Sequence, residues 1–246
     1  MNFERLIPIY LDEIDSTNAE AMRMLKQGKP AEGTCIVAGF QREGRGQRSN
    51  VWDSRPGENL LASFILYPRS FLAQRPFNLS KTIALAVHNT ISTFSSGKVQ
   101  IKWPNDILLD GKKVAGILLE NQWAGSTWQA AIAGIGINVN QTTFPIEKAT
   151  SLANNNGNSL SVDSVLKELQ MRLSDQYARL CKGQEASITE DYHQYLFGKD
   201  HFYIYQTANE LMKAKVISVA EDGRLEILSE KGDINHYDLS EVRLIY

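Results

Sequence analysis

The sequence predicts an α/β domain followed by a small all-β domain, and three observations support this fold class. Helix-like and strand-like segments alternate over residues 1–181. From about residue 199 onward only short strand-like segments occur, separated by turns that contain glycine. The 246 residues are 43% hydrophobic and 22% charged, an ordinary globular balance that can fill a sizeable core. We therefore expect one domain over residues 1–197 and a second over residues 198–246.

The first 67 residues carry the signals of one helix among strands. Thr17 and Glu20 stand three residues apart and form a capping box, which predicts that a helix begins there. Gly28 and Pro30 predict its end. Runs of β-branched and aromatic residues predict the neighbouring strands. These strands are expected at residues 6–11, 34–40 and 59–67, with an acidic turn at residues 12–15.

The rest of the chain predicts two further helices and two groups of strands. Apolar residues recur at helical spacing over residues 79–94 and 161–181, whereas the Asn-rich residues 151–158 predict a loop. The late, short strands suggest a small barrel or sandwich. Strands are expected at residues 99–103, 107–109, 113–122 and 128–139, and then at 202–206, 213–219, 225–229, 233–237 and 242–246.

Composition excludes several classes of protein. The net charge is −2, which gives no general attraction to nucleic acid. No apolar stretch approaches the roughly 20 residues that span a bilayer, and the N-terminus lacks the pattern of a secretion signal. The two cysteines, Cys35 and Cys181, are unpaired in sequence, and the four histidines show no ligand spacing. We therefore expect a cytoplasmic protein without a metal site of its own.

A Gly- and Arg-rich loop, QREGRGQRSN, follows a predicted strand at residues 41–50. Its two glycines around Arg45 permit unusual backbone angles and the close approach of a ligand. Loops that follow strands are common binding sites, although for this segment taken alone a solvated loop is the favoured interpretation. It does not have the GxxxxGK[ST] pattern of a phosphate-binding loop.

The string KWPND at residues 102–106 is a second candidate. Lys102 alternates with Ile101 and Trp103 on a predicted strand, so its side chain should face away from both. Pro104 ends the strand, and the following Asn-Asp predicts a turn. An exposed lysine before an Asx turn is the simpler explanation, but a tryptophan at a strand end favours a packed or functional position.

Two further segments have both structural and functional interpretations. In the strand AGIGINVN at residues 133–140, Gly134, Gly136 and Asn138 share one face. Two glycines on one face predict that a helix or a flat ligand presses against it. The string Ser16-Thr17-Asn18 either only caps the predicted helix or also binds a compact polar head group at its N-terminus.

Together these segments, in this order, resemble the catalytic part of biotin–protein ligases. KWPND is highly specific, and its pairing with the Gly-Arg-Gly loop makes coincidence improbable. The resemblance extends from about residue 10 to the C-terminus and weakens after Asn140. The matching strings are STN at residues 16–18, Gln41 with GRG at 44–46, KWPND at 102–106, KVAGIL at 113–118 and GIGIN at 134–138.

The resemblance implies a two-step reaction that uses ATP and Mg²⁺. Biotin and Mg²⁺-ATP form biotinyl-AMP, and a lysine of a biotin carboxyl carrier protein, part of a biotin-dependent carboxylase, then receives the biotin. It also implies a mixed sheet with flanking helices, as in class II synthetases, followed by a small SH3-like β-barrel. Mg²⁺ is expected to arrive with the nucleotide. No membrane or DNA partner is expected, and both a monomer and a homodimer remain open.

The resemblance also implies roles for individual residues. Lys102 and Arg45 are the expected catalytic residues, and Trp52 is expected near the adenine. The expected biotin-binding residues are Ser16, Thr17, Asn18, Gln41, Arg45, Gly46, Gln47, Lys102, Gly116, Gly134 and Gly136. The expected ATP-binding residues are Arg45, Arg48, Trp52, Lys102, Asn105, Lys113 and Asn138. The family loop usually reads Gly-Arg-Gly-Arg. Here Gln47 replaces the second Arg, and Ser49 replaces a frequent Gly. The adjacent Arg48 is a candidate to supply the missing positive charge.

Three rival functions remain. A lipoate- or octanoate-transferring enzyme shares the fold, but the Gly-Arg-Gly loop and KWPND favour biotin. Some biotin ligases also repress transcription through an N-terminal helix-turn-helix domain. Here the catalytic signature begins by residue 12, so we expect the stand-alone form. The third rival is a pseudo-enzyme that binds biotin without turnover, which the change at Gln47 leaves open.

Overall fold

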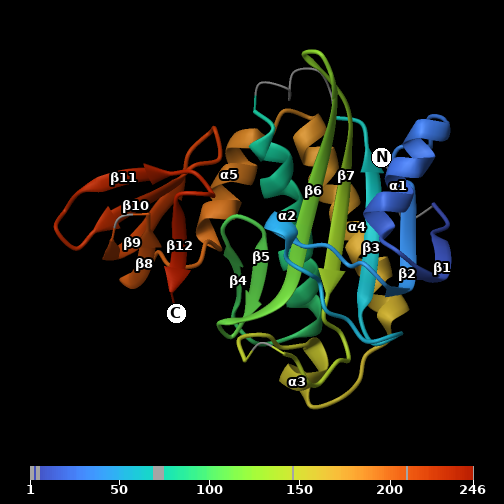
Figure 1. The fold of residues 1–246 in the computed structure, drawn as a ribbon, viewed down its shortest axis with the longest axis horizontal. Coiled ribbons are helices and arrows are strands. Elements are labelled where there is room, and N and C mark those ends of the chain that lie inside the picture. The colour runs from blue at the N-terminus through green and yellow to red at the C-terminus, as the bar shows by residue number, and fades with distance from the viewer. Residues whose placement is uncertain (1–2, 4–5, 69–74, 146, 209, 246) are drawn as a thin grey trace.

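The chain folds around two separate sheets (Figure 1). The computed structural model describes residues 3, 6–68, 75–145, 147–208 and 210–245. A seven-stranded mixed sheet with flanking helices is followed by a five-stranded antiparallel sheet near the C-terminus, which confirms the predicted fold class. No helix within these residues is long and apolar enough to cross a membrane.

The larger sheet has the strand order β1-β2-β3-β7-β6-β5-β4. β1 runs parallel to β2, and the other neighbouring strands are antiparallel. Successive side chains point to opposite faces, so Ile135 and Ile137 of β7 enter the main core while Gly134 and Gly136 face the other side, as predicted. The strands are β1 (Ile9–Ile14), β2 (Cys35–Gln41), β3 (Leu60–Leu66), β4 (Val99–Lys102), β5 (Asp106–Leu109), β6 (Lys112–Ala124) and β7 (Thr127–Ile137).

Helices cover both faces of this sheet. On one face, Ala21 of α1 (Thr17–Gln27) packs against buried isoleucines of β2, β3 and β7. On the other face lie α2 (Phe77–Phe94) and α4 (Val162–Cys181), whose buried residues join the main core. α5 (Glu185–Gln194) packs against both of them. The first face is therefore covered only in part, which leaves room for a site beside α1.

The C-terminal sheet docks beside α5 and the end of β4 (Figure 1). The Trp103 indole N–H donates to the Gly223 carbonyl oxygen at 2.9 Å, so this tryptophan packs at the junction, in line with the expectation for KWPND. Gly223 has φ +94°, and a Cβ there would lie 2.8 Å from Phe77 Cδ2, which requires glycine. The strands are β8 (Tyr203–Thr207), β9 (Leu211–Val219), β10 (Leu225–Ser229), β11 (Ile234–Tyr237) and β12 (Val242–Ile245), in the order β11-β10-β9-β8-β12.

The predicted capping box is wrong. Ser16, not Thr17, is the N-cap of α1, and the Ser16 side chain makes no capping hydrogen bond. Thr17 instead bonds to Gln41 through both its backbone N–H and its hydroxyl, and Glu20 pairs with Arg23. Long-range contacts have therefore displaced the local pairing that the sequence favours.

Three other predictions differ from the structure. The first strand begins at Ile9 and includes most of the expected acidic turn, because residues through Ile14 pair with β2. The expected loop at 151–158 contains a short helix, α3 (Leu152–Asn156), which the Ser151 hydroxyl caps by accepting from the Asn154 N–H. α5 was not predicted. Of the last predicted strand, residue 246 lies outside the described residues.

His193 of α5 contributes a pH-dependent contact to the docking of the C-terminal sheet. The Val219 N–H lies 3.0 Å from its Nε2, and the Val219 carbonyl oxygen lies 3.2 Å away. Burial lowers the pKa of His193 below its ordinary value, and the carbonyl offsets this only in part. Because the fold favours the neutral ring, this contribution is complete above about pH 6.5 and is lost as the pH falls through the lowered pKa.

His193→Gln should therefore flatten the acid side of the stability profile. Glutamine can accept from the Val219 N–H and does not titrate. Between pH 7 and pH 5 the Tm of the variant should fall less than that of the natural chain, by about 2 °C for a partly buried group. Differential scanning calorimetry measures this, and His88, whose pKa is also lowered by burial, is common to both chains. Parallel Tm profiles would contradict the assignment.

Candidate active site

A single cavity of about 730 Å³ brings the predicted segments together. It lies on the sheet face that α1 covers only in part and reaches to the C-terminal sheet. All of the expected site residues line it except Asn138, whose side-chain amide donates to the Thr150 carbonyl oxygen at 2.9 Å. Asn138 thus fastens the chain after β7, and its expected role toward ATP stays a prediction.

The lining of the cavity is strongly basic although the whole chain carries a net charge of −2. Only one carboxylate, that of Asp106, lies among the described lining residues. Such an excess of positive charge suits a polyanionic ligand. The basic lining residues are Arg45, Arg48, Lys102, Lys113, Lys148 and Arg243.

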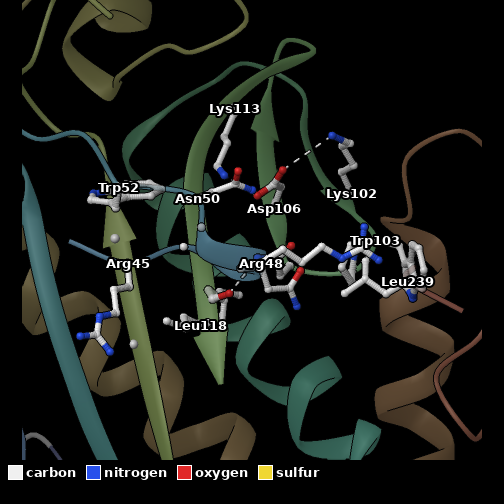
Figure 2. A pocket seen from close by; sticks show the side chains of 18 of the residues that line it. Arg45, Arg48, Asn50, Trp52, Lys102, Trp103, Asp106, Lys113, Leu118 and Leu239 are labelled. Atoms are coloured by element: carbon white, nitrogen blue, oxygen red, sulfur yellow. Dashed lines mark hydrogen bonds and ion pairs between the residues drawn. The ribbon is translucent and has the colours of Figure 1, made fainter. Parts of the chain in front are cut away.

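Asp106 lies between two of these lysines (Figure 2). Its carboxylate is 2.6 Å from the Lys113 ammonium and 3.6 Å from the Lys102 ammonium, and all three side chains are largely shielded from solvent. β4, β5 and β6 are adjacent, so the three residues share one edge of the sheet. Ile101 is fully buried in the core while Lys102 lines the cavity, which confirms that they face opposite ways.

The floor of the cavity is a pair of glycines covered by Trp52. Gly116 of β6 and Gly136 of β7 are paired across the sheet. A Cβ on Gly136 would lie 2.5 Å from Trp52 Cε2, and one on Gly116 would lie 2.8 Å from Trp52 Cζ3. The Lys113 ammonium stands 5.4 Å from the centre of the indole ring. The glycines therefore make space for a flat group, and here that group is an indole.

The Gly- and Arg-rich loop lines the cavity and forms a tight turn in which the Gly46 N–H donates to the Asn50 carbonyl oxygen at 2.7 Å. Gly44 serves close packing, because a Cβ there would lie 2.6 Å from the Trp52 carbonyl oxygen. The unusual backbone angle expected of the glycines occurs instead at Arg48, with φ 55°. The Arg45 side chain is 62% exposed and pairs with Glu43 at 3.8 Å. Figure 2 shows its guanidinium pointing away from Lys102, Asp106 and Lys113.

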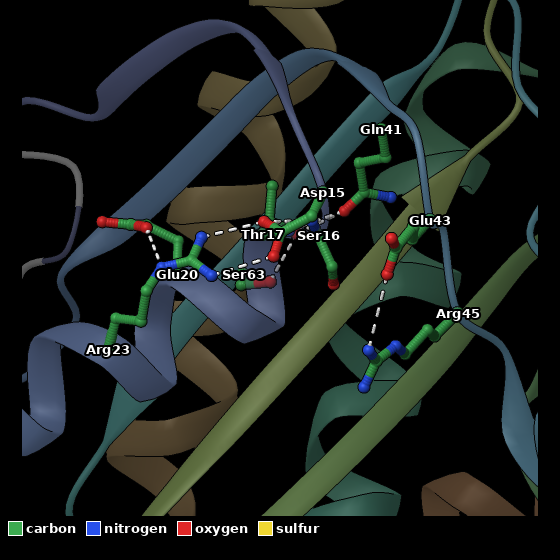
Figure 3. Close-up of polar contacts among 9 residues, drawn as sticks. All are labelled: Asp15, Ser16, Thr17, Glu20, Arg23, Gln41, Glu43, Arg45 and Ser63. Atoms are coloured by element: carbon green, nitrogen blue, oxygen red, sulfur yellow. Dashed lines mark hydrogen bonds and ion pairs between the residues drawn. The ribbon is translucent and has the colours of Figure 1, made fainter.

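The start of α1 supplies the polar end of the cavity (Figure 3). The Thr17 backbone N–H donates to Gln41 Oε1 at 2.7 Å, which turns the Gln41 amide nitrogen away from the helix. Asn18 lies directly over Gly134, where any Cβ would collide with its amide oxygen. Asp15 accepts from the Ser16 N–H and pairs with Arg23, whose hydrogen bond holds the pKa of Asp15 far below its usual value. The side chains of Thr17 and Asn18 therefore make tertiary contacts instead of capping the helix, and their binding of a polar head group stays a prediction.

Several lining residues were missed from the sequence. Asp106 stood inside the KWPND string but was given no role. The C-terminal sheet contributes Tyr205 and Arg243, which lie more than a hundred residues beyond Lys102 in the sequence. No local pattern marks either position. Burial raises the pKa of Tyr205 well above its usual range, so its hydroxyl stays protonated.

Comparison with known proteins agrees with the resemblance. The model of the biotin/lipoate A/B protein ligase family matches residues 10–138. The bifunctional ligase/repressor BirA of Bacillus spizizenii is 34% identical over 229 residues, which cover 91% of this chain and 70% of that protein. A biotin–[acetyl-CoA-carboxylase] ligase of Paracoccus denitrificans is 39% identical over 132 residues, which cover 52% of this chain and 53% of that protein.

A solved structure shows the same fold over nearly the whole length. The biotin protein ligase of Aquifex aeolicus in complex with biotin and ATP superposes with a TM-score of 0.78 at 28% identity, covering 96% of this chain and 97% of that one. The agreement of sequence and fold extends through both sheets. This chain belongs to the biotin/lipoate A/B protein ligase family.

Proposed function

We propose that this chain is a biotin–protein ligase that joins biotin to ATP as biotinyl-AMP and then transfers the biotin to a lysine of a carrier protein. The observation that carries this function is the arrangement of one continuous cavity. At the polar end of the cavity, Asn18 lies over Gly134. Trp52 lies over the glycine pair of the floor, and the Lys113 ammonium, which pairs with Asp106, lies over the Trp52 ring. The Aquifex relative was solved with biotin and ATP together.

In the first step, a biotin carboxylate oxygen attacks the α-phosphorus of ATP. The bond from that phosphorus to the oxygen bridging to the β-phosphate breaks, and pyrophosphate leaves with the electron pair. A carboxyl group with a pKa of about 4 is already ionised at pH 7, so no base is needed. The obstacle is repulsion between two anions, which Lys102 offsets as a cation inside a shielded cavity.

Two other basic residues have supporting roles. Lys113 stands over the Trp52 ring, where it can meet phosphate oxygens beside a stacked base. Arg45 lies in an exposed pair with Glu43, so its contribution requires the loop to turn it toward the phosphates. We propose that the loop orders over the intermediate and shields it from water, as lids do.

In the second step, the carrier lysine attacks the acyl carbon of biotinyl-AMP. The bond from that carbon to the phosphate oxygen breaks, AMP leaves, and the amine loses a proton. Its unperturbed pKa is about 10.4, so it must be deprotonated before attack. The carrier must reach the cavity, which residues of the C-terminal sheet help to line. We propose that residues 198–246 form a domain that helps to receive ATP or the carrier.

Mg²⁺ fits this site as a companion of the nucleotide. Within the described residues, no three His, Cys, Asp or Glu side chains are grouped to hold a metal ion. Asp106, the one carboxylate among the described lining residues, is already occupied by two lysines. Mg²⁺ prefers phosphate oxygens and water over a dedicated protein cage. When bound, Mg²⁺ would neutralise negative charge on the phosphates of ATP. We propose that the reaction takes place in the cytoplasm, where Mg²⁺-ATP is available.

Intact-mass spectrometry tests the whole reaction. A biotin carrier domain incubated with this protein, biotin and Mg²⁺-ATP should gain the mass of one biotinyl group, and only when ATP is present. A parallel reaction with lipoate should give no gain. A gain with lipoate alone would overturn the substrate, and no gain with either acid would contradict the ligase function.

A further inference from the structure

Two residues outside the cavity lining form a hydrogen-bonded network with the proposed biotin head-group residues. Ser63 of β3 is fully buried, and its hydroxyl lies 2.6 Å from Asn18 Oδ1 and 2.7 Å from Thr17 Oγ1. Glu120 of β6 lies at the far side, where its carboxylate accepts from Asn18 Nδ2 at 2.6 Å. The network thus runs from Glu120 through Asn18 and Ser63 to Thr17 and Gln41.

The orientation of the Asn18 amide is fixed by its partners. Its nitrogen faces the Glu120 carboxylate and the Leu118 carbonyl oxygen, at 2.6 and 3.3 Å, and both of these groups only accept hydrogen bonds. The amide oxygen must therefore face Ser63. An amide oxygen carries no proton, so the contact with Ser63 is a hydrogen bond only if Ser63 donates.

This orientation decides what Thr17 offers to a ligand. A hydroxyl has one proton, and that of Ser63 is used by Asn18, so Ser63 donates nothing to Thr17. The Thr17 proton is directed to Ser63 Oγ or to Gln41 Oε1, which leaves the Thr17 oxygen able to accept. Gln41 Oε1 is held by the Thr17 backbone N–H, so the Gln41 nitrogen remains a donor.

We propose that Glu120 and Ser63 are positioning residues that set the polarity of the head-group end of the cavity, an inference that rests on the proposed function. A cyclic urea carries N–H donors and one carbonyl acceptor. Such a ring matches a site that presents an acceptor at Thr17 beside a donor at Gln41. A dithiolane ring has neither group, so this polarity favours biotin over lipoate.

The test uses the fact that Ser63 can occupy the Thr17 acceptor only by donating to it. In Glu120→Gln, residue 120 can donate to Asn18 Oδ1, so the Asn18 amide can turn and donate to Ser63 at the loss of its longer, 3.3 Å contact with the Leu118 carbonyl oxygen. Ser63 then donates to Thr17 and competes with the ligand for the Thr17 oxygen. Biotin binding, measured by calorimetry without ATP, should weaken roughly five- to tenfold. The biotin KM should rise in step while kcat for biotinyl-AMP formation changes little.

Ser63→Ala removes the group that transmits the change. Alone it should weaken biotin binding by about two- to threefold, because the buried Asn18 oxygen loses its donor. Added to Glu120→Gln, it should restore most of the affinity that Glu120→Gln alone loses. Glu13→Gln is the matched control, since Glu13 is an exposed carboxylate that pairs with Arg42 on the same sheet. A merely structural role would make the two losses add instead.

Isosteric ligands supply a second readout. In the two cyclic carbamate analogues of biotin, oxygen replaces one of the ureido N–H groups. The analogue that lacks the N–H facing Thr17 should lose affinity for the natural chain and lose less for Glu120→Gln. Glu120→Gln binding biotin as tightly as the natural chain, or no recovery in the double variant, would overturn the assignment. Absence of biotin binding in the natural chain would overturn the proposed function itself.

Discussion

Lys102→Ala should slow the formation of biotinyl-AMP by about 100- to 1000-fold, the usual cost of removing one donor that stabilises charge in a transition state. The Lys102 side chain is only 23% exposed, so its charge acts in a shielded cavity where electrostatic attraction is strong. Lys113 cannot replace it, because its ammonium is held 2.6 Å from Asp106 and lies over Trp52. Single-turnover kinetics with labelled ATP measure the rate of this step.

Lys98→Ala is the matched control for Lys102. Lys98 lies just before β4, is 65% exposed, and pairs with Asp200 at 3.6 Å. Its removal should leave the rate within about twofold, since exposed ion pairs contribute little. In Lys102→Ala, the biotin Kd should change by a smaller factor than the rate of biotinyl-AMP formation. The reason is that the negative charge that Lys102 stabilises develops at the α-phosphate in the transition state. Near-normal biotinyl-AMP formation in Lys102→Ala would reject its catalytic role.

The second large effect is expected from filling the floor of the cavity. In Gly136→Val, the new side chain occupies the space of the Trp52 ring, since even a Cβ would lie 2.5 Å from Trp52 Cε2. Trp52 must then shift into the volume that a ligand would use. Overpacking of this kind costs about 1–3 kcal/mol, so binding of ATP, biotin or both should weaken by about 5- to 150-fold. Calorimetric titration with ATP and with biotin separately shows which ligand binds over the glycine floor.

Gly28→Ala is the control, because the space that a side chain would occupy at Gly28 is empty. A Cβ on Gly28 meets no atom within 4 Å, and its backbone is extended, with φ 174°. This variant should bind both ligands as the natural chain does. If Gly136→Val also bound both ligands normally, the glycine floor would not belong to the ligand site.

Local sequence patterns predicted most of the helices and strands, because apolar residues recur in them with a clear helical or strand period. The buried helix at residues 77–94 and the strands around KWPND lie close to where the sequence places them. Predictions failed where distant partners decide the outcome. Thr17 bonds to Gln41 and Ser63 rather than to Glu20, and β1 extends to Ile14 because β2 pairs with it. Capping preferences are weak beside such contacts.

The site was predicted as a set of residues but not as an arrangement. Resemblance placed Lys102, Trp52 and the glycines in one site, and the cavity contains them. The role of Asp106 between two lysines, and the buried hydroxyl of Ser63, arise from strands that pair far apart in the chain. A serine inside an apolar strand carries no signal of its own. Its meaning depends on which helix lies above it.

The measurement that tests the central claim most directly is the exchange of labelled pyrophosphate into ATP without any carrier protein. Reversible adenylation returns pyrophosphate to ATP only when the chain binds an acid that attacks the α-phosphorus. We predict exchange that requires biotin and Mg²⁺, is not supported by lipoate, and is reduced about 100-fold or more in Lys102→Ala. Exchange with lipoate but not biotin, or none with biotin at saturating ATP, would contradict the account.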